Sequence, residues 1–326
     1  MPEITYREAL NQALREEMER DPAVFLLGED VGLYGGSFKV TDGLLAEFGS
    51  ERVIDTPIAE GSIVGMAVGA AMAGLRPIVE LMTVNFALLA MDQIINHAAK
   101  IRYMFGGNAR VPMVIRAPGG GGQQLAAQHS QSLEAYFLHC PGLKVVCPAF
   151  PAEAKGLLKE AIRDDDPVMF LEHEALYGSK GEVPAGKYTT PMGKAKIIKE
   201  GKDITIVSFS RMAVLGFKAA QELSKEKIDA EVIDLRSLNP LDLKTIIASI
   251  KKTGRVVVVE EGWKTGGVGG EIVSLIMENG FDFLDAPVKR VAGKDVPMPY
   301  ARNLEKLAIP QMEDVIKAVK ETMNKG

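Results

Sequence analysis

A carboxylate stands where an apolar strand gives way to a helix of small residues, and this junction is the first candidate for chemistry. Glu60 follows the short strand and turn VIDTP, and Gly61, Gly65 and Gly69 then recur every four residues. That spacing places the glycines near one helix face, where each costs about 1 kcal/mol relative to alanine. Close packing of a neighbouring backbone would offset this cost. Glu60 is then either a carboxylate favoured by the helix dipole or a catalytic or ligand-binding group.

Two other stretches carry ionisable groups beside clustered glycines. Residues 28–43 read GEDVGLYGGSFKVTDG, so Glu29 and Asp30 lie in a loop that is either a plain turn or a backbone approach to a ligand. His129 follows the glycine run 119–122, which is not a phosphate loop because no Gly-Lys-Ser/Thr follows it. A lone histidine is usually structural or solvated, but one at the edge of a glycine-rich loop is a candidate for proton transfer.

Composition narrows the classes of function. The chain has 326 residues, 47% of them hydrophobic, which favours two globular domains. Its net charge of −5 argues against nucleic acid or an anionic membrane as the main partner. Cys140 and Cys147 cannot complete a zinc site, so we expect reduced thiols in a cytosol-like compartment. No signal-peptide pattern opens the sequence, and the apolar run 61–75 is shorter than the ~20 residues of a membrane span.

The elements that must position these groups alternate between strand and helix. A capping box at Thr5 and Glu8 predicts the first helix. In the first half we expect further helices over 61–73, 87–103 and 152–163, and strands at 24–27, 53–54, 76–82, 111–115, 143–147 and 167–171. In the second half we expect strands at 203–209, 230–235 and 255–261, and helices at 212–226, 241–252 and after the motif GGVGGE.

This alternation predicts an α/β protein with two open, mainly parallel, doubly wound domains, because such strands pair through right-handed crossovers. Residues 176–193 are rich in glycine, proline and polar residues, so we place the domain boundary there. The motif GGVGGE lacks the G-x-G-x-x-G spacing, and we interpret it as tight helix–sheet packing. A stand-alone nicotinamide oxidoreductase is excluded because the dinucleotide fingerprint is missing.

Eight motifs, taken together, resemble beta subunits of the pyruvate dehydrogenase component of 2-oxo-acid dehydrogenase complexes. They keep that family's order and spacing over nearly the whole chain: GEDVG-YGG, DTPIAEG, GAAMAGLRPIVE, AAQHSQ, HCPGLKVV, AIRDDDP, FLDAP and DVPMPYA. The resemblance implies a thiamine-diphosphate-dependent enzyme that works as a heterotetramer of two alpha and two beta chains. It also implies a pyrimidine-binding domain over 1–180, a linker over 181–195 and a transketolase C-terminal-like domain over 196–326.

The resemblance implies roles for individual residues. Glu60 resembles the glutamate that hydrogen-bonds the aminopyrimidine ring of the cofactor, and Phe86 resembles the aromatic residue that stacks on that ring. His129 resembles a histidine at the mouth of the active site, implicated in acyl transfer to lipoyl groups. Glu29 and Asp92 match acidic residues of a proton tunnel that joins two active sites. Glu29 would also lie beside the cofactor.

Ions and partners are implied in the same way. Potassium would be bound mostly by main-chain carbonyls of Met113, Ala161, Ile162, Asp164 and Asp166. Asp285, in FLDAP, resembles an acidic residue that meets the dihydrolipoyl acyltransferase core, or it is a surface aspartate without a role. The family's Gly-Asp-Gly segment for pyrophosphate and Mg²⁺ does not occur in this sequence, so we expect the alpha subunit to hold them. The small-residue face of 61–73 would then pack at a subunit contact.

We therefore expect oxidative decarboxylation of pyruvate with transfer of the acyl group to lipoyl domains. A branched-chain 2-oxo acid or acetoin dehydrogenase beta subunit is the alternative. Phe86 favours pyruvate because branched-chain relatives tend to carry tyrosine there. Some relatives have a glutamine where this chain has Leu89, so the polar contact of that glutamine is missing here and does not help to identify the substrate. A non-catalytic assembly scaffold is a further alternative, and the joint presence of Glu60, Phe86 and His129 speaks against it. The expected compartment is a bacterial cytoplasm, with a processed organellar chain as the alternative.

Overall fold

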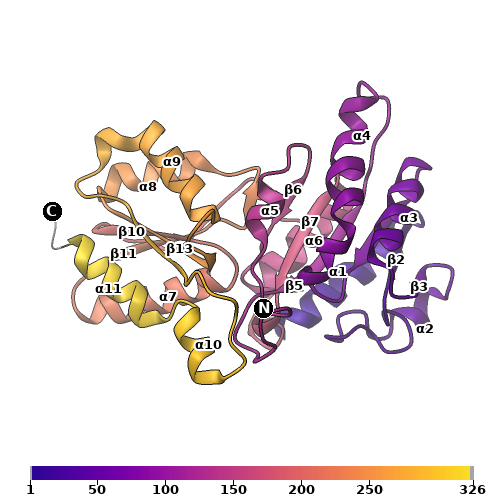
Figure 1. Ribbon diagram of the computed structural model, residues 1–326, viewed down its shortest axis with the longest axis horizontal. Coiled ribbons are helices and arrows are strands. Elements are labelled where there is room, and N and C mark those ends of the chain that lie inside the picture. Colours follow the sequence, from indigo (N-terminus) through magenta and orange to yellow (C-terminus); the bar gives the residue numbers. More distant parts are fainter. Residues whose placement is uncertain (1, 324–326) are drawn as a thin grey trace. The chain divides into compact units, whose positions relative to one another are not determined.

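The computed structural model describes residues 2–323, and its internal contacts divide them into two units. The first unit contains residues 2–119 and 136–192, and the second contains 120–135 and 193–323. Each unit has its own main sheet with packed helices (Figure 1). The segment 120–135, which includes part of the glycine run, therefore belongs with the second unit although it lies within the first half of the sequence.

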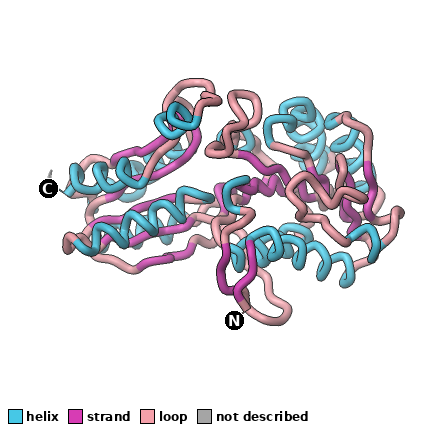
Figure 2. The backbone as a smooth tube through the Cα atoms, turned by 90° about the horizontal axis from the view of Figure 1, so that it is seen from below, coloured by secondary structure: helices cyan, strands magenta, loops and turns pink. Residues whose placement is uncertain are grey.

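The strands of the first unit are parallel and lie in the order β6-β7-β5-β4-β2-β3. They are β2 (Val24–Gly28), β3 (Val53–Asp55), β4 (Arg76–Glu80), β5 (Val114–Gly119), β6 (Lys144–Val146) and β7 (Val168–His173). A separate antiparallel pair joins β1 (Glu3–Thr5) to β8 (Lys180–Glu182). Residues of β2, β5 and β7 are buried throughout, as expected for parallel strands covered on both faces. Figure 2 shows these strands between helices.

The helices of this part of the chain confirm most of the expected pattern. They are α1 (Tyr6–Arg20), α2 (Leu44–Phe48), α3 (Glu60–Met72), η1 (Val84–Ala90), η2 (Asp92–Ala98), α4 (Ala99–Met104), α5 (Glu134–Leu138), α6 (Pro151–Arg163) and η3 (Glu174–Leu176). The capping box at the start of α1 is present, with the Thr5 hydroxyl accepting from the Glu8 N–H at 3.2 Å. α1 packs along α6.

The single helix expected over 87–103 is wrong in its geometry. A 3-10 stretch, η1, is followed by a π-helical stretch, η2, and only then by the short α4. The Thr83 hydroxyl caps η1 by accepting from the Asn85 N–H, and the Asp92 carboxylate accepts side-chain N–H groups inside η2. Apolar spacing does not distinguish these turns from an α-helix, because all three present similar faces over so few residues.

The glycines of α3 are only partly explained by close backbone packing. A Cβ at Gly61 would lie 3.3 Å from the carbonyl oxygen of Leu89, and one at Gly65 would lie 3.2 Å from the Gln93 side chain. A Cβ at Gly69 would meet nothing within 4 Å. The expected approach of a neighbouring backbone is therefore confirmed at Gly61 alone.

The second unit is a doubly wound sheet in the order β14-β13-β10-β11-β9, parallel except for β9. Its strands are β9 (Lys196–Lys199), β10 (Ile204–Ser208), β11 (Ala230–Asp234), β13 (Val256–Trp263) and β14 (Lys289–Gly293), with the short β12 (Ser237–Asn239) between β11 and the next helix in the chain. Its helices are α7 (Ser210–Lys225), α8 (Leu243–Thr253), α9 (Val268–Gly280), η4 (Phe281–Phe283), α10 (Arg302–Ala308) and α11 (Met312–Met323).

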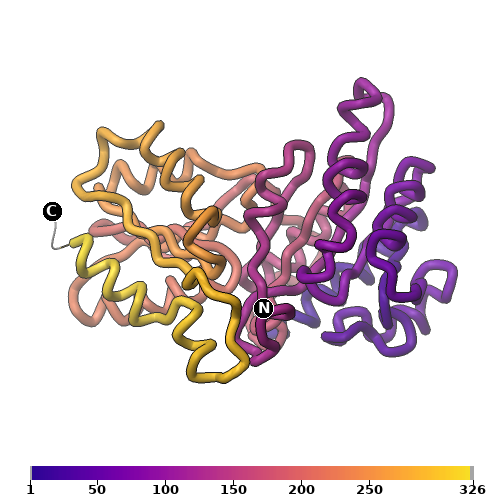
Figure 3. The backbone as a smooth tube through the Cα atoms, viewed as in Figure 1, coloured from indigo at the N-terminus to yellow at the C-terminus, as the bar shows by residue number. Residues whose placement is uncertain are grey.

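Two helix pairs cover the sheet of the second unit. The pair α8 and α9 lies on one side of the strands and the pair α7 and α11 on the other (Figure 1). The helix α11, yellow in Figure 3, packs against α7, although the two helices lie far apart in the sequence. Their apolar faces close over one buried core that includes Ile204, Ile206, Val257, Val315 and Val319. Within residues 2–323, every helix is too short or too polar to cross a membrane.

The motif GGVGGE packs tightly between helix and sheet, as expected, and its neighbour is a carboxylate. A Cβ at Gly267 or Gly269 would lie 2.5 or 2.4 Å from the side-chain oxygens of Glu260, which lies within β13. The Gly269 N–H donates to Glu260 at 2.9 Å, and Arg290 donates to the same carboxylate at 2.6 Å. The glycines thus let the start of α9 approach a buried charge pair.

Candidate active site

Glu29, Glu60 and Phe86 follow the carboxyl ends of three neighbouring parallel strands. Glu29 comes directly after β2, Glu60 begins α3 after β3, and Phe86 lies in η1 after β4. Because β4, β2 and β3 are adjacent and parallel, the three residues lie along one edge of the sheet. Open α/β sheets bind their ligands outside this carboxyl edge.

Glu29 and Glu60 are a pair of nearly buried carboxylates. Their exposed fractions are 7% and 5%, and within residues 2–323 neither carboxylate has a hydrogen-bond partner. Burial raises the pKa of Glu29, and the negative charges of Glu60 and Asp30 raise it further. The oxygens of both carboxylates retain some exposure, so a ligand at this edge of the sheet can reach them and form hydrogen bonds with them.

The start of α3 is also consistent with the simpler explanation of Glu60. The residue before it, Ala59, offers no side-chain cap, so the first backbone N–H groups of the helix have no side-chain acceptor there. A negative charge in this turn is favoured by the helix dipole. The dipole explains why the carboxylate is tolerated, but it leaves the carboxylate oxygens without a hydrogen-bond donor.

The loop that carries Glu29 is shaped by the protein itself. A Cβ at Gly28 would lie 2.4 Å from the carbonyl oxygen of Glu80, and Gly36, at a φ of +77°, would place one 2.9 Å from the Glu80 carboxylate. The Asp55 carboxylate accepts from the Gly32 N–H at 2.7 Å. These contacts account for the glycines of the loop without a ligand, so its glycine content alone is no evidence for a binding site.

A buried ion network lies under this loop. Arg116, 1% exposed, donates from Nε and Nη2 to both oxygens of Glu172, at 2.7 and 2.9 Å, and from Nη1 to Glu80. The Tyr177 hydroxyl donates to Glu172 at 2.7 Å. Burial would lower the pKa of Arg116, but the two carboxylates outweigh it and raise that pKa. Burial also raises the pKa of Glu80, against the opposing effect of Arg116.

The sequence analysis did not single out this network. Its signal is positional: Glu80 and Glu172 stand at or near the carboxyl ends of β4 and β7, and Arg116 lies in β5, the strand between them, where it is paired with Glu80 in the β4–β5 register. A charged residue that recurs near the ends of adjacent buried strands is rare without a partner. Opposite charges at neighbouring strand ends could therefore have been recognised, once the strand order was known.

Phe86 and Asp92 have different surroundings. Phe86 is partly exposed, and its N–H donates to the Thr83 carbonyl at 3.1 Å. The Asp92 side chain is 66% exposed, and its carboxylate accepts from the side chains of Gln93 and Asn96 at 3.2 and 2.8 Å. Unlike the buried carboxylate pair, Asp92 therefore makes its contacts with its own helical stretch.

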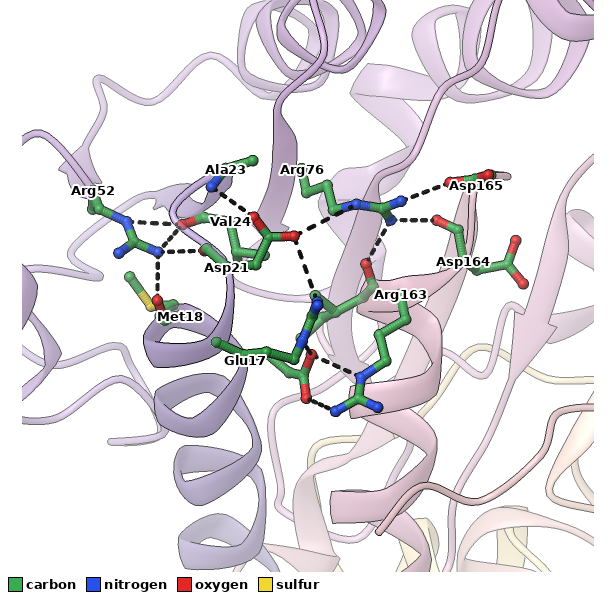
Figure 4. A network of polar contacts seen from close by, with 12 residues as sticks. Glu17, Met18, Asp21, Ala23, Val24, Arg52, Arg76, Arg163, Asp164 and Asp165 are labelled. Atoms are coloured by element: carbon green, nitrogen blue, oxygen red, sulfur yellow. Dashed lines mark hydrogen bonds and ion pairs between the residues drawn. The ribbon is translucent and has the colours of Figure 1, made fainter. Parts of the chain in front are cut away.

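Arg76 lies among the residues implied for potassium binding (Figure 4). Its Nη1 donates to the carbonyl oxygens of Ile162 and Asp164, both at 3.0 Å, and its Nη2 donates to the Asp165 carboxylate at 2.6 Å. Asp21, at the end of α1, lies 3.9 Å from Nε of the same guanidinium. A cationic side chain therefore already binds two of the five positions.

The remaining positions are also hydrogen-bonded. The carbonyls of Met113 and Ala161 each accept a backbone N–H, at 3.0 and 3.2 Å, and the Asp166 carboxylate pairs with Arg102 and lies 3.3 Å from Lys144. A carbonyl oxygen has two lone pairs, so each of these carbonyls can accept a second contact. Within residues 2–323, no cluster of three His, Cys, Asp or Glu side chains could hold a metal ion.

His129 and Asp285 both belong to the second unit. His129 is exposed, and its N–H donates to the Ala126 carbonyl at 3.4 Å. The Asp285 side chain is 58% exposed and lies 3.6 Å from Arg255, while its backbone N–H donates to the Gly254 carbonyl at 2.7 Å. Both side chains are thus accessible on the surface of their unit.

Two family models match the chain in succession. The transketolase pyrimidine-binding domain matches residues 2–180, and the transketolase C-terminal domain matches residues 193–315. A solved structure described as a split gene transketolase, inactive beta4 tetramer, has a TM-score of 0.81 at 28% sequence identity. That match covers 98% of each chain. The comparisons therefore agree with the two doubly wound units.

Curated relatives match over nearly the full length. The chain is 56% identical over 319 residues to the pyruvate dehydrogenase E1 component subunit beta of Rickettsia felis, covering 98% of both proteins. It is 55% identical over 322 residues to the mitochondrial pyruvate dehydrogenase E1 component subunit beta-1 of Oryza sativa subsp. japonica, covering 98% of this chain and 86% of the relative. Identity at this level and coverage extends over both units.

Proposed function

The chain belongs to the family of pyruvate dehydrogenase E1 component beta subunits, and we propose that it supports thiamine-diphosphate-dependent oxidative decarboxylation of pyruvate. The observation that carries the site is the pair of buried carboxylates, Glu29 and Glu60, without hydrogen-bond partners at the carboxyl edge of a parallel sheet. When bound, thiamine diphosphate supplies a nucleophilic carbon for the 2-oxo group and accepts the electron pair released with carbon dioxide.

Glu60 binds a nitrogen of the aminopyrimidine ring in this proposal. Its carboxyl group is nearly buried, so a hydrogen bond to it is strengthened by the low local dielectric. Its position in the first turn of α3 fixes the carboxyl group on a rigid element, next to the close contact between Gly61 and the Leu89 carbonyl. Glu60 can therefore hold or release a proton at one defined atom while the ring changes its protonation.

Glu29 and Phe86 complete the pyrimidine side of the proposed site. The raised pKa of Glu29 lets its carboxyl group carry a proton at a higher pH than an ordinary glutamate, as a proton-relay residue requires. The negative charge of Glu60 is one cause of this raised pKa, after burial, so the pKa of Glu29 depends on its neighbour in the proposed site. Phe86 is partly exposed, which leaves part of its ring available for stacking.

The acyl group passes to a lipoyl domain at His129 in this proposal. The lipoyl disulfide is both oxidant and acceptor: its S–S bond breaks, one sulfur would bond the acetyl carbon as that carbon is released from the cofactor, and the other sulfur would take up a proton. An imidazole is suited to supply that proton near neutral pH. The exposure of His129 suits a reaction in which the second substrate is itself a protein domain.

An alpha subunit supplies the pyrophosphate half of the cofactor site and its Mg²⁺, in a heterotetramer of two alpha and two beta chains. The missing Gly-Asp-Gly segment and the exposed face of α3 around Gly69 support this. Potassium binds the oxygens around Arg76, and Asp285 contacts the acyltransferase core. The compartment in this proposal is a bacterial cytoplasm or, for a processed chain, an organelle; the similar chains include one from the bacterium Rickettsia felis and a mitochondrial one from Oryza sativa.

Glu60→Gln tests the catalytic proposal. We expect turnover of the complex assembled with its alpha subunit to fall at least roughly 100-fold, because the amide cannot exchange the proton that a carboxyl group carries. Glu51→Gln, which removes an exposed carboxylate before β3, is the matched control and should keep full activity. Turnover by Glu60→Gln close to that of the wild type, with the melting temperature unchanged, would exclude Glu60 from the chemistry.

A further inference from the structure

Two carboxylates of the second unit bind the backbone of residues 120–135, which we call the glycine-rich segment. The Gly121 N–H donates to Oε1 of Glu261, near the end of β13, at 2.6 Å. Oε1 of Glu305, in α10, accepts from the N–H groups of both Gly122 and Gln124, at 2.9 and 3.0 Å. Glu261 and Glu305 are only 7% and 2% exposed; the hydrogen bond to Gly121 is buried, and the two hydrogen bonds to Glu305 are partly buried.

The Glu261 carboxylate is held in turn by its surroundings. Arg211 lies 3.2 Å from Oε2 of Glu261 and donates to the Gly121 carbonyl at 3.0 Å. The Ser132 hydroxyl donates to the same carboxylate at 3.4 Å. Glu261 accepts from the Gly121 N–H and Arg211 donates to the Gly121 carbonyl, so both backbone groups of Gly121 are bound. Ser132, later in the segment, binds the same Glu261 carboxylate.

The segment between these ties has a conformation that it would not adopt by itself. Gln124 and Ala126 have φ values of +58° and +65°, in the left-handed region that side chains other than glycine, asparagine and aspartate rarely occupy. Residues 122–125 and 127–129 are exposed, so little side-chain burial holds them. Strained backbone persists only where surrounding contacts impose it. The Glu305 hydrogen bonds to Gly122 and Gln124 are the contacts in the right place to do so.

We infer that Glu261 and Glu305 are positioning residues that hold the glycine-rich segment, and through it the backbone at His129, in the arrangement needed for acyl transfer. The inference rests on the proposed role of His129. Neither glutamate needs to touch a substrate, because each acts on backbone N–H groups before His129 in the chain. A purely structural role would instead lower the stability of the protein and impair every step equally.

Amide hydrogen exchange of the full chain tests the ties directly. Glu305→Ala removes both acceptor bonds, and we expect the amides of 122 and 124 to exchange at least roughly tenfold faster, because hydrogen bonds to charged groups are lost. Glu305→Gln keeps an acceptor oxygen without the charge and should give a smaller increase. Glu278→Gln, on the exposed face of α9, is the matched control and should change neither amide.

Two assays of the assembled complex test the positioning role. We expect Glu305→Ala to lower the kcat/KM for a lipoyl domain roughly tenfold, while decarboxylation measured with an artificial oxidant changes by less than about twofold. In a His129→Ala background, Glu305→Ala should cause no further loss of acyl transfer, because residues that act through one group are not additive. Glu305→Gln should restore part of the transfer rate.

Each contrary outcome identifies what fails. Equal losses in the two assays, unchanged exchange at 122 and 124, or a further loss in the His129→Ala background would overturn the positioning role. If His129→Ala transfers acyl groups as fast as the wild type, the proposed role of His129 fails and the positioning role falls with it. If His129→Ala is impaired but Glu305→Ala is not, only the positioning role is lost.

Discussion

At the scale of the residue, the carboxylates of this chain divide by what satisfies them. Glu80 and Glu172 share the guanidinium of Arg116, whereas Glu305 binds backbone N–H groups. Glu29 and Glu60 have no such partner within residues 2–323, and these two were recognised from the sequence by their positions beside glycines and after strands. The partners of the others could not be predicted, because they are set by strand register and by contacts across more than 100 residues of chain, as between Gly122 and Glu305.

Asp30→Asn should lower the pKa of Glu29. Burial and the charge of Glu60 remain in this variant, but the contribution of Asp30 is removed. Asparagine tolerates the φ of +55° found at this position, so the loop should keep its shape. If Glu29 governs the acid limb of the kcat/KM profile, that limb moves to lower pH by roughly a few tenths of a unit.

The control for this shift is Asp42→Asn. Asp42 is an exposed carboxylate in the same loop but is not among the charges that act on Glu29. The acid limb should stay in place in this variant. A limb that moves equally in both variants, or that moves to higher pH in Asp30→Asn, would contradict the role given to Glu29.

At the scale of the element, periodicity and apolar runs predicted most of the parallel strands and the longer helices of the first unit to within a few residues, together with three helices of the second unit. It failed at 87–103, where side-chain bonds of Thr83 and Asp92 accompany 3-10 and π turns instead of one α-helix. The same patterns did not predict the helices α10 and α11 or the two edge strands of the second sheet, β9 and β14. The helix that carries Glu305, α10, was therefore missed. The carboxyl edge that gathers Glu29 and Glu60 follows from strand order, which the alternation of elements indicates but does not specify.

Gly69→Ala should raise the melting temperature of the chain alone. A Cβ at Gly69 meets nothing within 4 Å, so alanine gains helix propensity of roughly 0.5–1 kcal/mol without a clash. Gly61→Ala should give no such gain, since its Cβ would lie 3.3 Å from the Leu89 carbonyl. In the assembled complex, where we expect this face to meet a partner, the gain at Gly69 should disappear. A gain at Gly61 and none at Gly69 would refute this account of α3.

At the scale of the molecule, two doubly wound units were expected and are found. The division of the sequence at 181–195 remains a prediction, and the grouping of 120–135 with the second unit was not anticipated. Nothing in the composition of RAPGGGGQQLAAQHS marks a change of unit, because that assignment depends on long-range contacts such as those with Glu261 and Glu305. The proposed half-site for the cofactor likewise depends on an alpha subunit, which cannot be derived from this chain alone.

The chain purified alone should show no pyruvate-dependent turnover. Adding a second chain that carries a Gly-Asp-Gly segment should restore turnover, with the rate levelling off when the two are equimolar. Reduction of an artificial electron acceptor measures this without a lipoyl domain. Steady turnover by this chain alone, in the presence of thiamine diphosphate and Mg²⁺, would contradict the shared cofactor site.

The path of the chain between its units limits how the protein can be dissected. The backbone passes from one unit to the other after residues 119, 135 and 192, so a single cut at the expected boundary does not separate two complete folding units. A fragment ending near residue 192 would keep Gly121, Gly122 and Gln124 but lose the acceptors Glu261 and Glu305. The backbone N–H groups of the three retained residues would then lose these hydrogen bonds. Expression of the first half alone therefore leaves the segment 120–135 without these acceptors, and the second half alone lacks the segment. A domain swap that keeps these contacts must exchange 120–135 together with 193–323.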